Sequence, residues 1–453
     1  MAIKKYDAAV IGAGSAGIVA ATMLAKHGKK TALIEKRDIG GECLNSGCIS
    51  SKILLKTAHL SQKIKNAAQL GISCSIEKPR LSDVMKAVSK TAFEITEQYR
   101  DKIKAEKNID FIEAQASFLD KNTLKAGDIE IKADKIIISS GSSAFIPEIE
   151  GLKETGFLTS CSVFSAKNLP NRLAVLGSGS IGLELGQSFL NLGSEVFIID
   201  RSAGPFHRED AEIGPLIKSK LEEEGMKFIP FASVKKVSRK NGKKIITLEI
   251  KGETKDLEVD EILAATGRKP NTFSLNLKSA GIETNERGFI KTNSYLETSV
   301  KNIYAAGDCA GPYLFAHMAV YQAKLAAENI LYGNKKETDY SAVPWTTYTS
   351  PEVAHVGLNE NEAKEKSVFF RSHIIDLKNI DRAVSEKDTK GFLKLILGEK
   401  DKILGVTIVS EKAGEMIGMG VLSLKKNFSA DNFGGLILPY PTVSEIYTFA
   451  AEK

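Results

Sequence analysis

The amino-acid sequence predicts an α/β protein with two similar strand–helix–strand units and a C-terminal α+β domain. In the N-terminal unit, the apolar strand pattern of DAAVIGAGSAG ends in a glycine turn and continues into a helical pattern. The same order returns in RLAVLGSGSIG, 165 residues further along. From about Val343 the pattern changes to strands and a hairpin without such a turn. Because alternating strands and helices are typical of parallel sheets covered by helices, both units are predicted to be Rossmann-type nucleotide-binding domains.

The first glycine turn fits the GxGxxG pattern with Gly12, Gly14 and Gly17. A helical run and the strand TALIE follow, and Glu35 ends that strand, 23 residues after Gly12. Glycines in such a turn let the backbone approach a pyrophosphate, which the positive end of the helix attracts, while the acidic residue binds ribose hydroxyls. These residues predict a dinucleotide site.

The second turn repeats the pattern with Gly177, Gly179 and Gly182, and Asp200 takes the position of Glu35. A second dinucleotide site is therefore predicted. Asp200 favours NADH, because a carboxylate accepts hydrogen bonds from ribose hydroxyls and repels a 2′-phosphate. Arg201 and Arg208 bring positive charge close by, so use of NADP stays open.

Other elements follow from the periodicity of apolar residues. Helices are expected at 50–71, 82–106, 316–331 and 411–426, strands at 134–141, 145–151 and 302–311, and a hairpin at 391–409. The predicted domains are 1–150 together with 271–335 for the first nucleotide, 151–270 for the second, and 336–453 for substrate contact or subunit pairing.

Cys43 and Cys48, in GGECLNSGCISSK, lie just after the first nucleotide unit. Two thiols beside a bound cofactor can take up two electrons as a dithiol and release them as a disulfide. Two unrelated buried cysteines are the alternative, but Asn45 and Gly47 between them indicate a tight, special backbone. A zinc site is disfavoured, because no second cysteine pair or histidine pair supplies the remaining ligands.

The composition is that of an ordinary globular chain, with 453 residues, a formal net charge of +6 and five cysteines. Because the basic residues are dispersed, nucleic-acid binding is not expected. No apolar run approaches the ~18 residues of a membrane span, and five cysteines do not form a disulfide scaffold. The chain starts almost directly with a strand, so we expect no secretory signal and a cytoplasmic location.

Together, GAGSAG with Glu35, CLNSGCISSK, GSGSIG, ATGRKPN, AAGDCAG and YPTVSE make the whole chain resemble the flavoprotein disulfide reductases. The resemblance implies FAD in the first unit, NADH or NADPH in the second, and a C-terminal domain that forms a homodimer. It also implies transfer of two electrons between NADH and a dithiol or disulfide, most like dihydrolipoamide dehydrogenase.

The residue roles come from the same resemblance. Cys43 matches the thiol that exchanges with substrate, and Cys48 the thiol that lies against the flavin. Lys52 matches the lysine near the reactive edge of the flavin, and Glu184 its ion-pair partner. Asp308 matches an FAD-binding carboxylate, and the turns that contain Gly141 and Gly267 match cofactor-binding segments. Because Cys48 falls near a helix start with Lys52 one turn along, its thiol pKa is predicted to be lowered.

Tyr440 is a departure from the family pattern, because dithiol-using relatives carry a histidine base there, in HPTxxE. An ordinary tyrosine titrates near 10, so it is a poor base at neutral pH. Glu445 keeps the family's carboxylate position, and the resemblance implies that Tyr440 and Glu445 belong to the catalytic residues; without an imidazole to orient, a role of Glu445 in the fold alone is the alternative. Mercuric reductases also have tyrosine near this place, so metal-ion reduction is an alternative function, although no cysteine follows Cys309 to deliver the metal. A flavin-only quinone or oxidant reductase with redox-sensing thiols is another alternative.

The remaining cysteines stand alone in the sequence, and we expect each to be a small buried residue: Cys74, Cys161 and Cys309.

Overall fold

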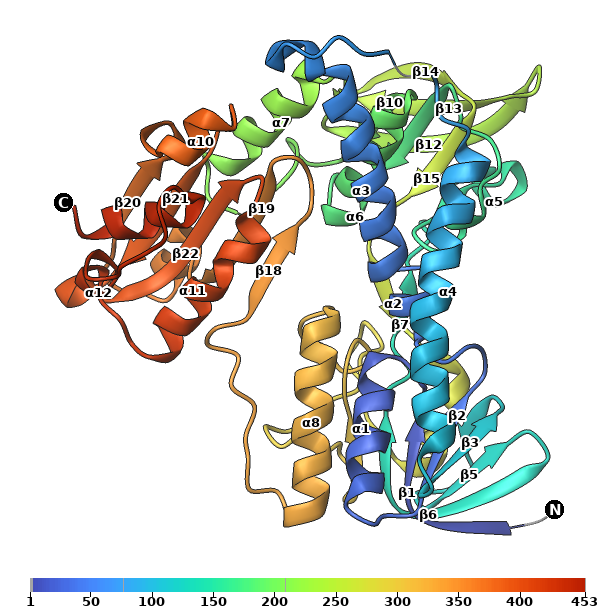
Figure 1. Cartoon of the computed structure of the whole chain (residues 1–453). Coiled ribbons are helices and arrows are strands. Elements are labelled where there is room, and N and C mark those ends of the chain that lie inside the picture. The colour runs from blue at the N-terminus through green and yellow to red at the C-terminus, as the bar shows by residue number, and fades with distance from the viewer. Residues whose placement is uncertain (1–2, 76, 208, 453) are drawn as a thin grey trace.

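Three bodies are visible in the computed structural model, which describes residues 3–75, 77–207 and 209–452 (Figure 1). The N-terminal sheet lies at the bottom of the view, the second nucleotide unit at the upper right, and the C-terminal domain at the left. Two long helices, α3 (Cys48–Lys65) and α4 (Leu81–Ala105), span the distance between the first two bodies.

The first sheet has the order β3-β2-β1-β6-β5-β4, and β17 also pairs with β6. Its strands are β1 (Ile3–Ile11), β2 (Thr31–Glu35), β3 (Ile109–Glu113), β4 (Ala116–Phe118), β5 (Thr123–Ala126), β6 (Ile129–Ile138) and β17 (Ile303–Ala305). Helix α1 (Ser15–Lys26) packs beside α8 (Ala316–Tyr332) over one face. Both helices bury several alanines, so their backbones approach closely.

The second unit has a parallel sheet of order β11-β10-β9-β15-β8. Its strands are β8 (Leu158–Thr159), β9 (Arg172–Leu176), β10 (Glu195–Ile199), β11 (Lys227–Ile229) and β15 (Glu261–Ala264). Helices α6 (Ser180–Leu192) and α7 (Ile213–Glu223) belong to it, with the antiparallel strands β12 (Ala232–Lys240), β13 (Lys243–Ile250) and β14 (Glu253–Val259). The predicted repeat is confirmed, because β9–α6–β10 has the same order and parallel pairing as β1–α1–β2.

The two nucleotide units are joined by a short antiparallel pair, β7 (Ser142–Ala144) and β16 (Arg268–Pro270). Both segments lie where the sequence leaves or re-enters the first unit. The strand predicted at 145–151 is wrong: apart from a single bridge at Glu150, this stretch has no strand pairing before α5 (Leu152–Thr155). Pro147 gives the physical reason, because proline cannot donate to a strand ladder.

The predicted long helices are confirmed as α3, α4 and α8. In α4, the buried residues recur every three or four positions, as Leu81, Met85, Val88, Ala92 and Thr96 show. The short helix α2 (Gly41–Asn45) precedes α3. Short 3₁₀ helices cover Ala67–Leu70, Ser162–Ser165, Phe273–Leu275, Leu277–Ala280, Leu377–Asn379 and Glu399–Asp401.

The C-terminal domain is an antiparallel sheet of order β18-β19-β22-β21-β20 with helices around it. The strands are β18 (Pro344–Thr347), β19 (Glu352–Gly357), β20 (Arg371–Asp376), β21 (Phe392–Leu397) and β22 (Ile403–Ser410). The helices are α9 (Glu360–Glu365), α10 (Asp381–Ser385), α11 (Ala413–Lys425), α12 (Ala430–Gly434) and the 3₁₀ helix η7 (Val443–Ala451). The predicted hairpin is β21–β22, and the predicted helix at 411–426 is α11, so both predictions are confirmed.

Across the described ranges of the chain, no helix combines the length and the apolar character that crossing a membrane requires.

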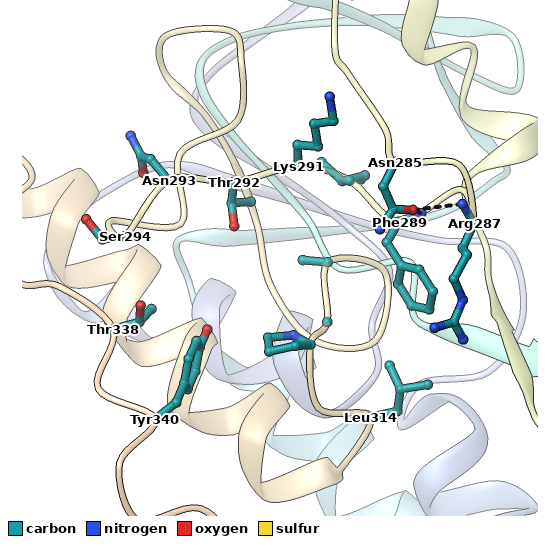
Figure 2. Close-up of a pocket in the computed structure, with 14 residues that line it drawn as sticks. Asn285, Arg287, Phe289, Lys291, Thr292, Asn293, Ser294, Leu314, Thr338 and Tyr340 are labelled. Atoms are coloured by element: carbon teal, nitrogen blue, oxygen red, sulfur yellow. Dashed lines mark hydrogen bonds between the residues drawn. The ribbon is translucent and has the colours of Figure 1, made fainter. Parts of the chain in front are cut away.

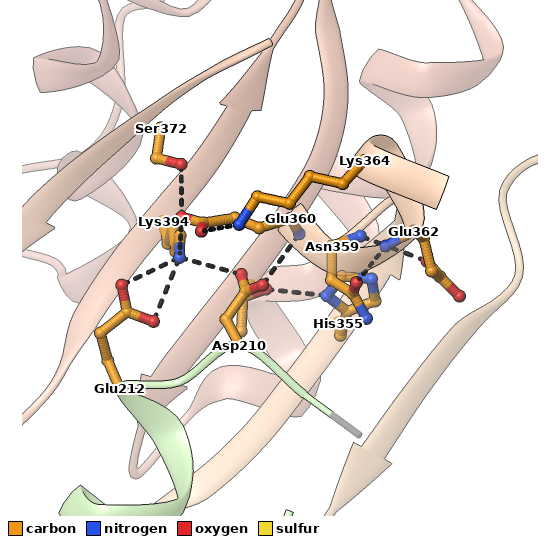
Figure 3. Close-up of polar contacts among 10 residues, drawn as sticks. Asp210, Glu212, His355, Asn359, Glu360, Glu362, Lys364, Ser372 and Lys394 are labelled. Atoms are coloured by element: carbon orange, nitrogen blue, oxygen red, sulfur yellow. Dashed lines mark hydrogen bonds and ion pairs between the residues drawn. The ribbon is translucent and has the colours of Figure 1, made fainter. Parts of the chain in front are cut away.

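A buried lysine joins the C-terminal domain to the second nucleotide unit (Figure 3). Lys394, on β21, has no exposed side-chain surface, and its ammonium lies 3.1 Å from Asp210, 3.0 Å from Glu212 and 2.7 Å from Glu360. Burial alone would lower the pKa of Lys394, but the hydrogen bonds that it donates to these carboxylates raise it. The lysine is therefore charged, and it neutralises Asp210, which is itself buried.

Replacing Lys394 by methionine should destabilise the protein by about 3 kcal/mol, because it keeps the side-chain volume but leaves a buried carboxylate without its cation. Urea denaturation should show a lower midpoint. Lys390→Met is the matched control, since Lys390 pairs with Glu223 on the exposed surface and its loss should leave the midpoint unchanged. Equal midpoints for the two variants would contradict the structural role of Lys394.

Candidate redox and dinucleotide site

The first glycine turn is built by close backbone contacts. Gly12 has φ +100°, and a Cβ placed there would lie 2.5 Å from the Ser139 carbonyl oxygen. A Cβ on Gly17 would lie 1.7 Å from the Gly12 carbonyl oxygen. At Gly14, by contrast, a Cβ would meet nothing within 4 Å, and no side chain caps the helix that starts there. The N-terminus of α1 thus has open space and free N–H groups, as a pyrophosphate requires.

The second turn repeats this arrangement. Gly177 has φ +104°, and a Cβ there would lie 2.6 Å from the Ala265 carbonyl oxygen. A Cβ on Gly182 would lie 2.2 Å from the Gly177 carbonyl oxygen. Gly179 again has nothing within 4 Å, and α6 begins there without a side-chain cap. The residues of both turns therefore fit a dinucleotide.

The predicted carboxylates reach back to these turns. Glu35 accepts hydrogen bonds from the backbone N–H of Ala13 at 2.7 Å and of Arg37 at 2.9 Å. Asp200 accepts from the backbone N–H of Ser178 at 2.6 Å and of Ser202 at 2.7 Å, and from both hydroxyls.

Burial would raise the pKa of Asp200, but the hydrogen bonds from Ser202 and Ser178 lower it, so this carboxylate carries a full negative charge. That charge is what the predicted preference for NADH requires. Arg201 follows it directly in the sequence, whereas Arg208 lies outside the described residues.

The loop that holds the cysteine pair is tightly folded, as predicted from Asn45 and Gly47. The Asn45 side-chain amide donates to the carbonyl oxygens of Ile39 at 3.0 Å and Gly41 at 2.9 Å. A Cβ on Gly47 would lie 2.7 Å from the Glu42 carbonyl oxygen. Cys43 is in α2 and Cys48 is the first residue of α3, so the short connection through Ser46 and Gly47 brings the thiols together.

The thiols of Cys43 and Cys48 are reduced in this structure and hydrogen-bonded to each other. The bond from Cys48 is the main reason that the pKa of Cys43 is lowered to about 6; burial opposes the effect and a hydrogen bond with Ser15 adds to it. The pKa of Cys48 is raised, mainly by the same bond to Cys43, although the charge of Lys52 acts in the opposite direction. The predicted lowering at Cys48 is therefore wrong for this dithiol, because the bond to Cys43 outweighs the charge of Lys52.

Lys52 and Glu184 form the expected ion pair, with 2.9 Å between Nζ and Oε2. Lys52 lies one turn after Cys48 in α3, and Glu184 is a buried residue of α6. The backbone N–H of Tyr348 donates to the other carboxylate oxygen of Glu184 at 3.0 Å. The Lys52 ammonium also lies 4.2 Å from the centre of the Tyr348 ring.

Asp308 lies in a polar cluster near the cysteines. The Ser142 hydroxyl donates to its carboxylate at 2.5 Å, and Arg268 lies 3.6 Å away. Arg268 also bonds to Glu42 at 2.5 Å, inside the cysteine loop. Burial is the main reason that the pKa of Asp308 is raised. A bound group with hydroxyls could take over these polar contacts, so the cluster fits the ribityl chain of a flavin.

Gly141 and Gly267 flank the paired strands β7 and β16. Their φ values are +70° and +119°, and their carbonyl oxygens accept from Asn271 N–H at 2.9 Å and Phe145 N–H at 2.8 Å. The structure thus places both glycines at the link between the nucleotide units.

Tyr440 and Glu445 belong to a separate segment of the C-terminal domain. The Tyr440 side chain is 71% exposed, and its hydroxyl donates to Asp381 at 2.9 Å. This bond raises the pKa of Tyr440. The Glu445 carboxylate accepts from the Thr442 N–H at 2.9 Å and caps η7, so it contributes to the fold of this segment.

Two residues of the site were not singled out in the sequence. Arg268 lies within ATGRKPN, so that motif could have pointed to it. No pattern in the sequence points to Tyr348, because it reaches Lys52 only through tertiary packing. Of the isolated cysteines, Cys309 is buried as predicted, whereas Cys74 is exposed and Cys161 is half-buried, with its sulfur 2.9 Å from the Ser46 hydroxyl.

A pocket of about 650 Å³ lies outside this site (Figure 2). Figure 2 shows Arg287, Phe289 and Leu314 on one side of it and Thr338 and Tyr340 on the other. No predicted site residue lines it.

Replacing Cys48 by alanine should raise the pKa of Cys43 from about 6 towards its ordinary value of 9.0, because the largest cause of the lowering is removed. At pH 7 the thiolate fraction of Cys43 should fall to roughly one hundredth. The pH dependence of Cys43 alkylation by iodoacetamide, followed by mass spectrometry on the reduced protein, measures this. Cys74→Ala is the control and should leave the pH midpoint of Cys43 alkylation unchanged. An unchanged midpoint in Cys48→Ala would show that Cys48 does not donate the hydrogen bond that lowers the pKa of Cys43.

Gly14→Ala and Gly179→Ala test the two nucleotide turns against each other. Both glycines have ordinary negative φ values and free space, so both variants should fold. The added methyl occupies the space beside the helix N-terminus, so we expect about tenfold weaker FAD binding in Gly14→Ala and about tenfold higher KM for NADH in Gly179→Ala. Flavin titration and steady-state kinetics check this, and an effect of Gly14→Ala on NADH alone would reverse the assignment.

Comparisons with known proteins agree with this geometry. The model of the pyridine nucleotide-disulphide oxidoreductase family matches residues 6–323, and that of the family's dimerisation domain matches residues 343–451. A mercuric reductase from Staphylococcus aureus is 36% identical over 448 residues, which cover 98% of this chain and 82% of that protein. A dihydrolipoyl dehydrogenase from the same organism is 33% identical over 453 residues, covering 99% and 96%.

Among solved structures, the HOCl-induced flavoprotein disulfide reductase RclA from Escherichia coli aligns with a TM-score of 0.89 and 28% identity, covering 99% of this chain and 100% of that one. Its Cu(II) complex aligns with the same TM-score and 29% identity, covering 98% and 99%. Members of the matched family depend on FAD and take electrons from NAD(P)H. This chain therefore belongs to the pyridine nucleotide-disulphide oxidoreductase family and carries that family's dimerisation domain.

Proposed function

We propose that this protein is an FAD-dependent reductase that takes electrons from NADH and passes two of them, through Cys43 and Cys48, to a thiophilic metal ion. Support comes from relatives that act on or hold such ions, namely the mercuric reductase from Staphylococcus aureus and RclA with Cu(II). The dihydrolipoyl dehydrogenase is similar to nearly the same degree, so the choice between the acceptors must come from the site itself.

The proposed cofactor sites follow the two repeats. FAD is assigned to the first turn and NADH to the second; when bound, FAD would supply the hydride acceptor that links NADH to the Cys43–Cys48 disulfide. The residues proposed for FAD are Gly12, Gly14, Gly17, Glu35, Gly141 and Asp308. Those proposed for NADH are Gly177, Gly179, Gly182, Asp200 and Gly267. The domain limits proposed are 1–150 with 271–335, 151–270, and 336–453, the last pairing in a homodimer.

Tyr440 is the observation that carries the choice of acceptor. Oxidation of a dithiol needs a base to remove its protons, and the position at which dithiol-using relatives have a histidine holds a tyrosine. Its pKa is raised further by the bond to Asp381, so it does not act as a base at neutral pH. A soft metal ion binds thiolates without any proton transfer from the substrate.

The electron balance is simple for such an acceptor. One NADH supplies two electrons, which reduce the Cys43–Cys48 disulfide to a dithiol after uptake of protons. Transfer of these two electrons from the dithiol to one Hg²⁺ gives Hg⁰ and the disulfide again. The overall reaction converts NADH and Hg²⁺ into NAD⁺, H⁺ and Hg⁰. The lowered pKa of Cys43 supplies the first sulfur ligand as a thiolate at neutral pH.

Reduction of a disulfide substrate is a second candidate, favoured by the same Cys43 thiolate. A thiolate attacks a disulfide sulfur directly, so this direction needs no base to activate the enzyme. The leaving thiolate would then take its proton from water. Oxidation of dihydrolipoamide is disfavoured, because there the substrate must lose protons.

A screen of the purified holoenzyme tests the proposal. With NADH or NADPH as donor, Hg²⁺, Cu²⁺, lipoamide, glutathione disulfide and a quinone are compared as acceptors. We expect metal-ion reduction with NADH that is lost in Cys43→Ser. Quinone turnover that survives Cys43→Ser, without metal or disulfide activity in the wild type, would overturn the proposal in favour of a flavin-only reductase.

Tyr440→His should raise dihydrolipoamide oxidation about 100-fold, since positioned general bases contribute factors of that order. The same change should leave metal-ion reduction within about twofold, because that reaction uses no base there. Steady-state kinetics on both substrates measure the two effects. Tyr332→His, at another exposed tyrosine, is the matched control. Failure of Tyr440→His to change dithiol turnover would show that the missing imidazole does not limit it.

A further inference from the structure

The Lys52 ammonium is held by two contacts from different parts of the chain. Its side chain is 40% exposed, so a free lysine here would sample several rotamers in water. Instead, Glu184 on α6 accepts from Nζ at 2.9 Å, and the Tyr348 ring lies 4.2 Å away. A cation this close to an aromatic face is attracted by the ring.

Tyr348 acts on both members of the ion pair. Its ring contacts the Lys52 ammonium, and its backbone N–H donates to Glu184 Oε1 at 3.0 Å. Glu184 uses its other oxygen for Lys52. One residue thus fixes the carboxylate through the backbone and the ammonium through the side chain. A substitution at Tyr348 removes only the second contact, so the contribution of the ring can be measured by itself.

The ring of Tyr348 is fixed in turn by the C-terminal domain. A Cβ placed on Gly414, at the start of α11, would lie 3.3 Å from Tyr348 Cε1 and 3.2 Å from Glu352 Oε2. Glu352 accepts from the Gly414 N–H at 2.8 Å, which ties β19 to α11 behind the ring. Burial is the main reason that the pKa of Tyr348 is raised, so the phenol is neutral at physiological pH. The ring therefore presents an uncharged aromatic face in a packed position.

We propose that Tyr348 is a positioning residue that holds the Lys52 ammonium in place beside the Cys43–Cys48 pair. The proposal rests on the proposed function only in taking this pair as the redox centre. It also gives the domain that matches the dimerisation model, residues 343–451, a role inside the active site of its own chain.

The first test looks at the contact itself. Reductive dimethylation of lysines with ¹³C-formaldehyde keeps their charge, and a methyl-lysine over an aromatic ring gives an NMR signal shifted upfield. We expect such a signal in the holoenzyme, absent in Lys52→Arg, retained in Tyr348→Phe and lost in Tyr348→Leu. If the wild-type spectrum lacks the upfield signal, the contact between Lys52 and Tyr348 is contradicted. The measurement therefore remains a test even if Tyr348→Leu does not fold.

The second test counts the thiols formed when NADH is added without any acceptor, by alkylation and mass spectrometry. We expect Tyr348→Leu to form the Cys43–Cys48 dithiol about fivefold more slowly, and Tyr348→Phe to stay within about twofold of the wild type. Tyr332→Leu, an exposed tyrosine of α8, is the control and should match the wild type.

Equal rates for Tyr348→Leu and the wild type would overturn the proposal. Equal loss in the folded Tyr348→Phe and Tyr348→Leu variants would also overturn it, since the hydroxyl and not the ring would then matter. These results are separable from the proposed function. If the wild type forms thiols with NADH but reduces no metal ion, the acceptor is wrong and this test still stands; if it forms no thiols, the proposed function fails and the NMR signal decides about Tyr348.

Discussion

The packing of α3 against α6 is the contact on which the site depends. Helix α3 begins with Cys48 and belongs to the first nucleotide unit, whereas α6 begins at the glycine turn of the second. Between the two helices, Lys52 pairs with Glu184. Nearer the end of α3, the Ser61 hydroxyl and the Lys65 ammonium donate to the Asn191 carbonyl oxygen, at 3.1 and 2.7 Å. The helix that begins with Cys48 is thereby fixed to the helix that begins at the second glycine turn.

Local features of the site could be predicted from the sequence because local backbone geometry determines them. The glycines must be glycine, since a Cβ at Gly12 or Gly177 would collide with a carbonyl oxygen of the neighbouring strand connection. Glu35 and Asp200 accept hydrogen bonds from their glycine turns because the strand before each carboxylate ends beside the turn. The tight loop around Asn45 and the start of a helix at Cys48 are likewise determined by residues that are close in the sequence.

The features that could not be predicted depend on contacts between distant segments. The pKa of Cys48 is raised by its side-chain hydrogen bond with Cys43, which helix position does not reveal. Tyr348 and Arg268 reach the site from far along the chain, and the exposure of Cys74 depends on how the chain after α3 packs. The strand expected at 145–151 does not form, because Pro147 lacks a backbone donor for a strand ladder.

The two-stranded link between the nucleotide units has a mechanical consequence. Sliding β7 along β16 would break the bonds from Phe145 to Gly267 and from Asn271 to Gly141. The two crossings of the chain between the units are therefore locked in one register. Together with the α3–α6 contact, this gives the two units two separate points of attachment, so neither can shift along the other without breaking hydrogen bonds.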